Sequence, residues 1–227
     1  MRKLAWIALT AAVAVVVPAA AAAKVVVVRS VGPSAKVYPP GKALPDSASI
    51  KLGNGDAVTL LGPSASRTLR GPGTFPATTA GRSSLAMTAG RRSRFGAMRS
   101  GEITSAPSLW DVDVTQAGTI CIAEPAKLKL WRPNADSAAT LNIRGGGAAQ
   151  AVEFAAGHAT VPWPAQLPIA NDREFELELA GSGDRSTIRF AMVNAPPADL
   201  VAAAELLIAK GCQNQLDLLV ETADKAD

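Results

Sequence analysis

The chain has 227 residues, of which 48% are hydrophobic and 4% aromatic, and its 23 basic and 19 acidic side chains give a formal net charge of +4. A single His excludes a zinc site built from several His residues, and two Cys exclude a four-thiolate site or a disulfide-rich scaffold. The length suits one or two domains with a real hydrophobic core and is short for a large multi-domain enzyme.

Residues 1–23 have the layout of a secretory signal peptide. Arg2 and Lys3 form a basic start, an uncharged apolar run of 14 residues occupies 4–17, and small residues precede Lys24. We expect cleavage after Ala23, which leaves 21 basic against 19 acidic residues and a net charge of +2. The alternative is an uncleaved membrane anchor, but such an apolar run spans only about 21 Å as a helix, short of a hydrocarbon core of about 30 Å.

Short apolar runs separated by Gly and Pro turns fill residues 24–77. The β-branched run at 25–31 predicts a strand, and further strands are predicted at 49–52, 57–61 and 67–70. The Gly and Pro residues of 71–75 end this pattern. The segment therefore predicts a small all-β domain.

Residues 78–101 contain five Arg and no acidic residue, so the basic character of the protein is concentrated here. We interpret the segment as a linker with some helical tendency. A functional alternative is that Arg91, Arg92, Arg94 and Arg99 form a patch for an anionic partner, such as lipid head groups, cell-wall polymers or an acidic protein. Nucleic acid is not expected as a partner of an exported protein.

Residues 102–195 alternate apolar and polar side chains with the period of half-buried strands. The predicted strands are 109–115, 119–123, 127–131, 140–144, 152–154, 174–179 and 187–191. Seven or so strands in this length predict a β-sandwich of immunoglobulin-like size.

The period changes to that of a helix in the C-terminal segment, residues 196–227. Pro197 and Asp199 begin the helix, and Lys210 followed by Gly211 ends it. Leu216, Leu219 and Val220 predict a second, short helical stretch, and 222–227 are expected to fray. The fold class is therefore mainly β: a small β unit, an Arg-rich linker, a β-sandwich and a C-terminal helical segment.

Cys121 and Cys212 are expected to form a disulfide, because the chain is predicted to be exported and has no other Cys. Cys121 falls in a predicted strand and Cys212 just after the first predicted helix. The bond would pin the C-terminal helix to the sandwich. Two unpaired buried thiols are the alternative.

The sequence holds no nucleophile elbow and no phosphate-binding P-loop. A hydrolase would have to use Asp111, Asp113 and His158, the two Asp residues lying on one face of a predicted strand. A water-exposed strand face explains the Asp pair equally well, and a lone loop His is more often structural or solvated. We assign no catalytic residue, no cofactor-binding residue and no metal ligand.

Three Trp residues, Trp110, Trp131 and Trp163, fall within or beside the predicted strands of the sandwich. They could line a platform that binds glycan. Anchoring the core is the more frequent use of Trp in a small sandwich, and we favour it.

The first β unit resembles the periplasmic FecR-like domain of bacterial regulators. The resemblance is carried by Tyr38-x-x-Gly41-x-x-Leu44 and by Ile50-x-Leu52-x-x-Gly55-Asp56-x-Val58-Thr59-Leu60-Leu61. Arg67-Thr68-Leu69-x-Gly71-Pro72-Gly73-Thr74-Phe75 is similar to a stretch of uncharacterised exported proteins of sphingomonad-type alphaproteobacteria. This resemblance implies a β-rich envelope domain that makes protein contacts.

FecR regulators carry a cytoplasmic anti-sigma region and a membrane helix before this domain, whereas here a signal peptide precedes it. Direct control of a sigma factor is therefore not expected. We expect a non-enzymatic protein of the periplasm, or secreted, that acts as an interaction or sensory accessory module with an envelope protein partner. The alternatives are a module that binds cell-wall or outer-membrane glycan or lipid, and a hydrolase.

Overall fold

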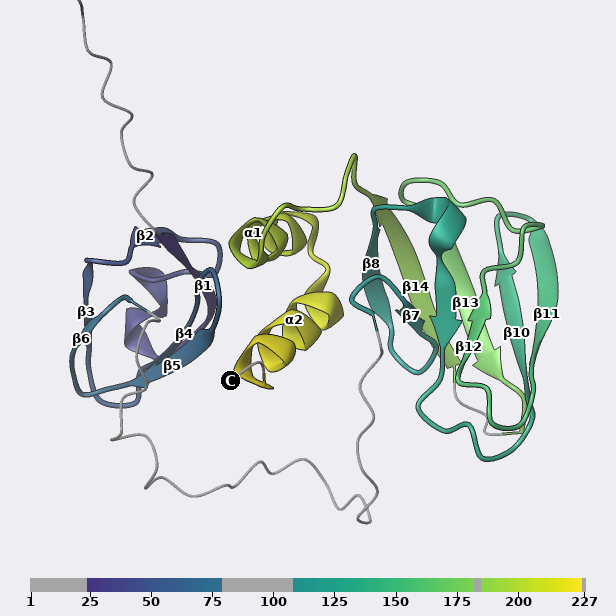
Figure 1. Cartoon of the computed structure of the whole chain (residues 1–227), viewed down its shortest axis with the longest axis horizontal. Coiled ribbons are helices and arrows are strands. Elements are labelled where there is room, and N and C mark those ends of the chain that lie inside the picture. Colours follow the sequence, from purple (N-terminus) through teal and green to yellow (C-terminus); the bar gives the residue numbers. More distant parts are fainter. Residues whose placement is uncertain (1–23, 79–107, 182–184, 226–227) are drawn as a thin grey trace, which may run out of the picture.

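The computed structural model describes residues 24–78, 108–181 and 185–225, and its fold is mainly β with two C-terminal helices (Figure 1). The predicted signal peptide and the Arg-rich segment, except for its first residue Thr78, lie outside these residues. No helix in the described ranges is long and apolar enough to cross a membrane.

The N-terminal β unit contains two antiparallel sheets around a small core. Its strands are β1 (Lys24–Val31), β2 (Ala43–Pro45), β3 (Ser49–Leu52), β4 (Ala57–Leu61), β5 (Ser66–Arg70) and β6 (Gly73–Pro76), with a 3-10 helix, η1 (Pro33–Lys36), after β1. The sheet orders are β2-β1-β4-β5 and β3-β6. The predicted strands are confirmed, but 71–75 does more than end the unit, because β6 pairs with β3.

The run of four Val residues in β1 follows from the burial of this strand on both of its faces. Val25 and Val27 face the core of the N-terminal unit, whereas Val26 and Val28 face the opposite way into a second core. All four are at most 2% exposed. A strand buried on both faces has a continuous apolar sequence instead of an alternating one.

The second β unit is a sandwich of two sheets, as predicted. The larger sheet has the order β11-β10-β13-β14-β8 and the smaller one β12-β9-β7. The strands are β7 (Val112–Asp113), β8 (Gly118–Ile122), β9 (Lys129–Trp131), β10 (Ala139–Gly145), β11 (Ala148–Phe154), β12 (Thr160–Pro162), β13 (Glu174–Leu179) and β14 (Arg185–Met192), and a 3-10 helix, η3 (Pro125–Lys127), precedes β9. Trp163, Phe175 and Phe190 meet in the core between the sheets, with ring centroids 5.0–5.3 Å apart.

The predicted strand at 109–115 is wrong over most of its length, since only Val112 and Asp113 pair with another strand. The side chain of Ser108 accepts a hydrogen bond from the backbone of Trp110 and folds the chain into a turn. Asp113 in turn accepts hydrogen bonds from the backbone and hydroxyl of Thr115, which ends the strand. Polar side chains that bond to the nearby backbone thus override the alternating pattern.

The two C-terminal helices are α1 (Leu200–Lys210) and α2 (Gln213–Lys225). Asp199 caps α1 by accepting a hydrogen bond from the backbone of Ala202, and Gly211 ends it with a φ of 73°, where Gly is favoured. Helix α2 is longer than predicted and continues through most of the tail that was expected to fray. Its apolar side packs into the core, which stabilises the helix beyond its intrinsic propensity.

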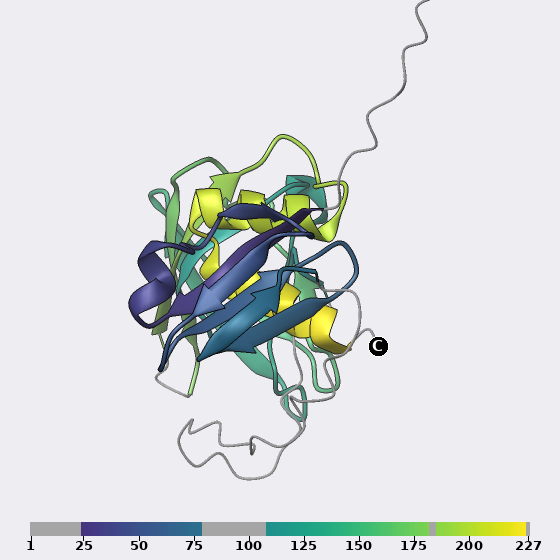
Figure 2. The same cartoon turned by 90° about the vertical axis from the view of Figure 1, so that its left-hand side faces the viewer.

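The helix pair lies between the two β units and shares one hydrophobic core with both (Figures 1 and 2). The N-terminal unit contributes Val26, Val28 and Leu61, and the sandwich contributes Cys121, Ala191 and Val193. Two ion pairs reinforce the contact with β1: Lys24 binds Glu205 on α1, and Arg29 binds Asp217 on α2. The described parts therefore form one body in which the helices are the common layer.

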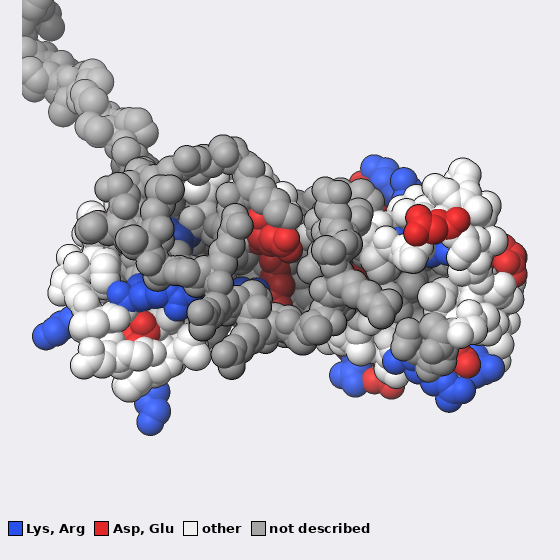
Figure 3. Space-filling view, turned by 90° about the horizontal axis from the view of Figure 1, so that it is seen from below, with Lys and Arg blue, Asp and Glu red and all other residues white. Residues whose placement is uncertain are grey.

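The water-exposed face of the larger sheet carries matched charges. The three Glu residues of β13 all find Arg partners: Glu174 pairs with Arg189, Glu176 with Arg185, and Glu178 with both Arg144 and Arg185. Acidic and basic side chains are correspondingly mixed over the sandwich (Figure 3).

Candidate functional site

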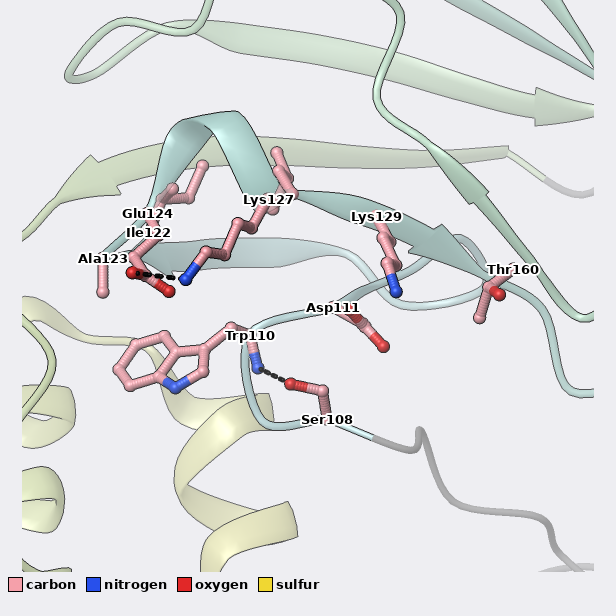
Figure 4. A pocket seen from close by; sticks show the side chains of 10 residues that line it. Ser108, Trp110, Asp111, Ile122, Ala123, Glu124, Lys127, Lys129 and Thr160 are labelled. Atoms are coloured by element: carbon pink, nitrogen blue, oxygen red, sulfur yellow. Dashed lines mark hydrogen bonds and ion pairs between the residues drawn. The ribbon is translucent and has the colours of Figure 1, made fainter.

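A pocket of about 480 Å³ opens where the loop at 108–111 meets the rim of the sandwich (Figure 4). It is lined by polar, charged and apolar side chains from four stretches of the chain. They are Ser108, Trp110, Asp111, Ile122, Ala123, Glu124, Lys127, Leu128, Lys129 and Thr160. Its volume is within the range of about 300–1,000 Å³ that is typical of small-molecule sites.

The loop at 108–111 forms one wall of the pocket and is held by a hydrogen bond within the loop and by another from α2. Within the loop, the backbone of Asp111 donates to the carbonyl of Ser108 over 3.2 Å. From α2, the side-chain amide of Gln215 donates to the carbonyl of Leu109 over 2.8 Å. Trp110 packs against the core around the helices, so its half-buried indole is fixed at the pocket wall.

The floor of the pocket is fixed to α2 as well. Ile122 follows Cys121 on β8, and Cys121 is bonded to Cys212, which precedes α2, with a Cα–Cα distance of 5.8 Å. The Gln215 amide also makes two hydrogen bonds with the backbone of Cys121, of 2.6 and 3.0 Å. The predicted disulfide is thus confirmed, and it joins the sandwich to the helices as expected.

Two pairs of oppositely charged residues line the pocket, but only one of them forms an ion pair. At the rim, exposed Lys127 and Glu124 form an ion pair of 2.9 Å. The second pair is Asp111, which is half-buried, and Lys129, which is exposed and reaches from β9 toward Asp111 (Figure 4). Within the described residues, neither of their side chains forms a hydrogen bond or a salt bridge.

The carboxyl of Asp111 is partly removed from water. This burial raises its pKa, and the nearby positive charge of Lys129 offsets part of the rise. The pocket therefore offers a carboxylate, an ammonium group, hydroxyls and an aromatic face. Such a set of groups can bind a small polar ligand with an apolar part.

Two of the three Trp residues serve the core, as favoured from the sequence. Trp131 and Trp163 are at most 8% exposed, and the indole of Trp163 donates to the carbonyl of Leu167 over 2.7 Å. Only Trp110 of the three lines the pocket. A platform made of all three rings is not present.

The structure does not bring the three residues of the hydrolase hypothesis into one pocket. Asp111 lines the pocket, whereas Asp113 accepts hydrogen bonds from Thr115 and Gln116 in the turn after β7. His158 is exposed in the loop between β11 and β12 and is not among the residues that line the pocket. In the described parts of the chain, no group of three or more His, Cys, Asp or Glu is placed to hold a metal ion.

The Arg patch, Arg91, Arg92, Arg94 and Arg99, lies outside the described residues, so its contacts with the pocket are not defined. The described chain resumes at Ser108, which is itself a pocket residue.

Sequence reasoning missed Gln215 and Lys129. Gln215 is 4% exposed and stands between two buried residues, Cys212 just before α2 and Leu219 within it. A Gln within an apolar helical stripe is a signal that could have been found, because a buried amide needs partners. Lys129 gave no such signal, since an alternating strand explains a Lys at its position.

Comparisons of the chain with protein-family models, with curated proteins and with solved structures find no match.

Proposed function

We propose that the protein is an exported, non-enzymatic component of the periplasm that acts as an interaction or sensory accessory module of the cell envelope. The signal-peptide pattern of 1–23 and the disulfide support export, since disulfides persist in oxidising compartments. The resemblance of 24–77 to FecR-like domains supports a role in protein contacts.

The observation that carries this proposal is the helix pair shared by the two β units. Both units bury side chains in one core with α1 and α2, and ion pairs and a disulfide reinforce the two contacts. Two β surfaces are thereby held in a fixed relation to each other. A fixed relation lets one partner contact both surfaces without a cost in ordering them.

The proposal is tested by chemical crosslinking in intact cells, followed by purification of the tagged protein and identification of its partners. We expect a defined envelope protein to be captured by the wild type. Capture should fall in a variant with Cys121→Ala and Cys212→Ala, because the fixed relation is weakened. Recovery of no envelope protein above the level of an unrelated exported control protein would contradict the proposal.

A second candidate is a module that binds cell-wall or outer-membrane glycan or lipid. It is favoured by the indole of Trp110 beside the hydroxyls of Ser108 and Thr160 in one pocket, since an aromatic face with nearby polar groups suits a sugar ring. The Arg patch would add attraction to anionic polymers.

Sedimentation with purified cell-wall sacculi or lipopolysaccharide tests this candidate. Trp110→Ala should reduce sedimentation if the pocket binds glycan, and replacing Arg91, Arg92 and Arg94 by Ser should reduce it if the Arg patch binds. Absence of co-sedimentation by the wild type would remove the candidate altogether.

A further inference from the structure

Most charged side chains on the described part of the sandwich form an ion pair or a hydrogen bond, whereas the side chains of Asp111 and Lys129 form neither with a described residue. The Glu residues of β13 all have Arg partners, and at the rim of the pocket Glu124 has Lys127. Asp111 and Lys129 line the same pocket with opposite charges, yet no ion pair joins them or links either to another described residue. The pocket thus presents one acceptor and one donor of full charge to whatever enters it.

We propose that this pocket binds a small zwitterion, namely a free amino acid or the end of a short peptide. In this assignment Asp111 binds the ammonium group of the ligand and Lys129 binds its carboxylate. The inference rests on the proposed function, because it names a ligand class for an exported binding module.

The charges of the pocket discriminate between classes of ligand. A simple cation would be attracted by Asp111 but repelled by Lys129, and a simple anion would meet the reverse situation. A neutral sugar would leave both charged groups without a charged partner while removing water from them, which is costly. A zwitterion pairs with both groups through charge-assisted hydrogen bonds.

The remaining lining suits the apolar part of such a ligand. Ile122 and Leu128 are buried beneath the pocket and Trp110 forms its aromatic wall. The rim residues Glu124 and Lys127 are exposed, so a peptide chain could continue into solvent from the pocket. The aromatic and aliphatic surfaces predict a preference for ligands with an apolar side chain.

Binding is tested by calorimetry and NMR with a panel of probes: glycine, alanine, leucine, phenylalanine and dialanine. We expect saturable binding that shifts the resonances of Trp110 and Thr160, with leucine or phenylalanine stronger than glycine. Asp111→Asn and Lys129→Met should each weaken binding by about tenfold or more, as expected from losing a hydrogen bond to a charged group. Lys51→Met is the matched control and should leave binding unchanged, because this exposed Lys of β3 is not among the residues that line the pocket.

Modified probes separate the two charged contacts. Leucine amide lacks the carboxylate and N-acetyl-leucine lacks the ammonium group. Leucine amide should bind the wild type more weakly than leucine does, but this difference should disappear in Lys129→Met. N-acetyl-leucine should likewise bind the wild type more weakly than leucine does, and this difference should disappear in Asp111→Asn. The two pairs form double-mutant cycles, in which only interacting groups give non-additive effects.

A second readout comes from the titration of Asp111. A bound ammonium group should lower the pKa of this carboxyl from its burial-raised value, which NMR can follow with and without leucine.

Three outcomes would overturn the inference. They are no resonance shift with any probe at about 10 mM, equal binding by the wild type and both charge variants, and binding of a neutral disaccharide in place of amino acids. The partner-capture experiment in cells is independent of these results. Its failure would count against the envelope interaction module, whereas failure of the probes alone would remove only the ligand.

Discussion

At the scale of single residues, the side chain of Gln215 makes the backbone hydrogen bonds that a neighbouring strand would otherwise make. Strand β8 is an edge of the five-stranded sheet, and the Gln215 amide satisfies both the backbone N–H and the carbonyl of Cys121 on its open side. The same amide bonds the carbonyl of Leu109. One side chain therefore fixes α2, β8 and the wall of the pocket together.

Replacing Gln215 by Ala should lower the free energy of unfolding by about 2–4 kcal/mol, because it leaves buried backbone groups without partners and opens space in the core. Urea denaturation measures this change. Asn214→Ala on the same helix is the control, since its side chain makes one hydrogen bond, to the carbonyl of Ala117, at a partly exposed site, and we expect a cost of about 1 kcal/mol or less. Equal costs for the two variants would show that the Gln215 amide has no special role.

Asp56 is the second residue of this kind, because its carboxylate joins the 3-10 helix η1 to the turn before β4. It is 3% exposed, and its carboxylate accepts hydrogen bonds from the hydroxyl and backbone of Ser34 and from the backbone of Gly53. The bonds from Ser34 are the main cause that lowers the pKa of Asp56, against an opposing effect of burial. The carboxylate thereby ties η1 to the turn before β4.

The lowered pKa predicts how stability depends on pH. A carboxyl whose pKa is lower in the folded state stabilises the protein above its unfolded pKa of about 3.9, and this contribution is lost as the pH falls through the folded value. The difference in unfolding free energy between the wild type and Asp56→Asn should thus be constant near neutral pH and shrink below about pH 4. Urea denaturation from about pH 7 to pH 3 measures it.

Ser34→Ala provides the comparison for Asp56, because it removes the hydroxyl bond while leaving the carboxyl in place. It should show a smaller effect with the same direction of pH dependence. A difference between wild type and Asp56→Asn that stays unchanged down to about pH 3 would contradict the role of the ionised carboxylate.

At the scale of elements, local signals were enough to predict most strands and the first helix. Strands β3, β4 and β13 match their predicted bounds because alternation and turn residues agree with burial. The hairpin between β10 and β11 turns through Gly146 and Gly147, whose positive φ values of 60° and 82° fit a tight two-residue turn. Strands β2 and β12, of three residues each, were missed because so short a run carries no periodic signal.

The candidate site was less predictable than the fold. The disulfide followed from the count of Cys and the expected export, and Asp111 and Trp110 were noticed as chemistry-bearing residues. Their position beside Lys129 could not be predicted, because it depends on the parallel pairing of β7 with β9, which is set by the packing of distant segments.

The N-terminal cap of α1 gives a prediction at this scale. Asp199→Ala should lower the free energy of unfolding by about 0.5–2 kcal/mol, since the side chain no longer accepts the hydrogen bond from the backbone of Ala202. Chemical denaturation provides the measurement. Asp199→Asn keeps a capping oxygen and should stay close to the wild type. A loss as large for Asn as for Ala would mean that the charge, and not the hydrogen bond, matters.

At the scale of the whole molecule, the disulfide closes a loop of 91 residues that contains the entire sandwich after β8. The chain-entropy model assigns a loop of this length roughly 4–5 kcal/mol of stabilisation. The variant with Cys121→Ala and Cys212→Ala should lose several kcal/mol in urea denaturation, and reduction should destabilise the wild type similarly. Reducing agent should leave the double variant unchanged, which controls for other effects of the reagent.

The shared core predicts that damage in the helices reaches both β units. Leu207 of α1 is fully buried in that core, so Leu207→Ala should cost about 2–5 kcal/mol. Hydrogen exchange should then show weaker protection in β1 and β4 as well as in β8 and β14. Leu69→Ala alters only the core of the N-terminal unit and should reduce protection mainly there. Loss confined to one unit in Leu207→Ala would argue that the units are independent.

The helices follow both β units in the sequence, which has a consequence for the order of assembly. Val26, Val28 and Leu61 precede the helices that cover them, and these helices are made after the sandwich. Until the helices have been synthesised, the outer face of the N-terminal sheet is apolar and uncovered. Cys121 likewise has no disulfide partner until Cys212 has been made. The shared core can therefore form only after both β units have been made, and a chain truncated before α1 would expose an apolar, aggregation-prone surface on each β unit.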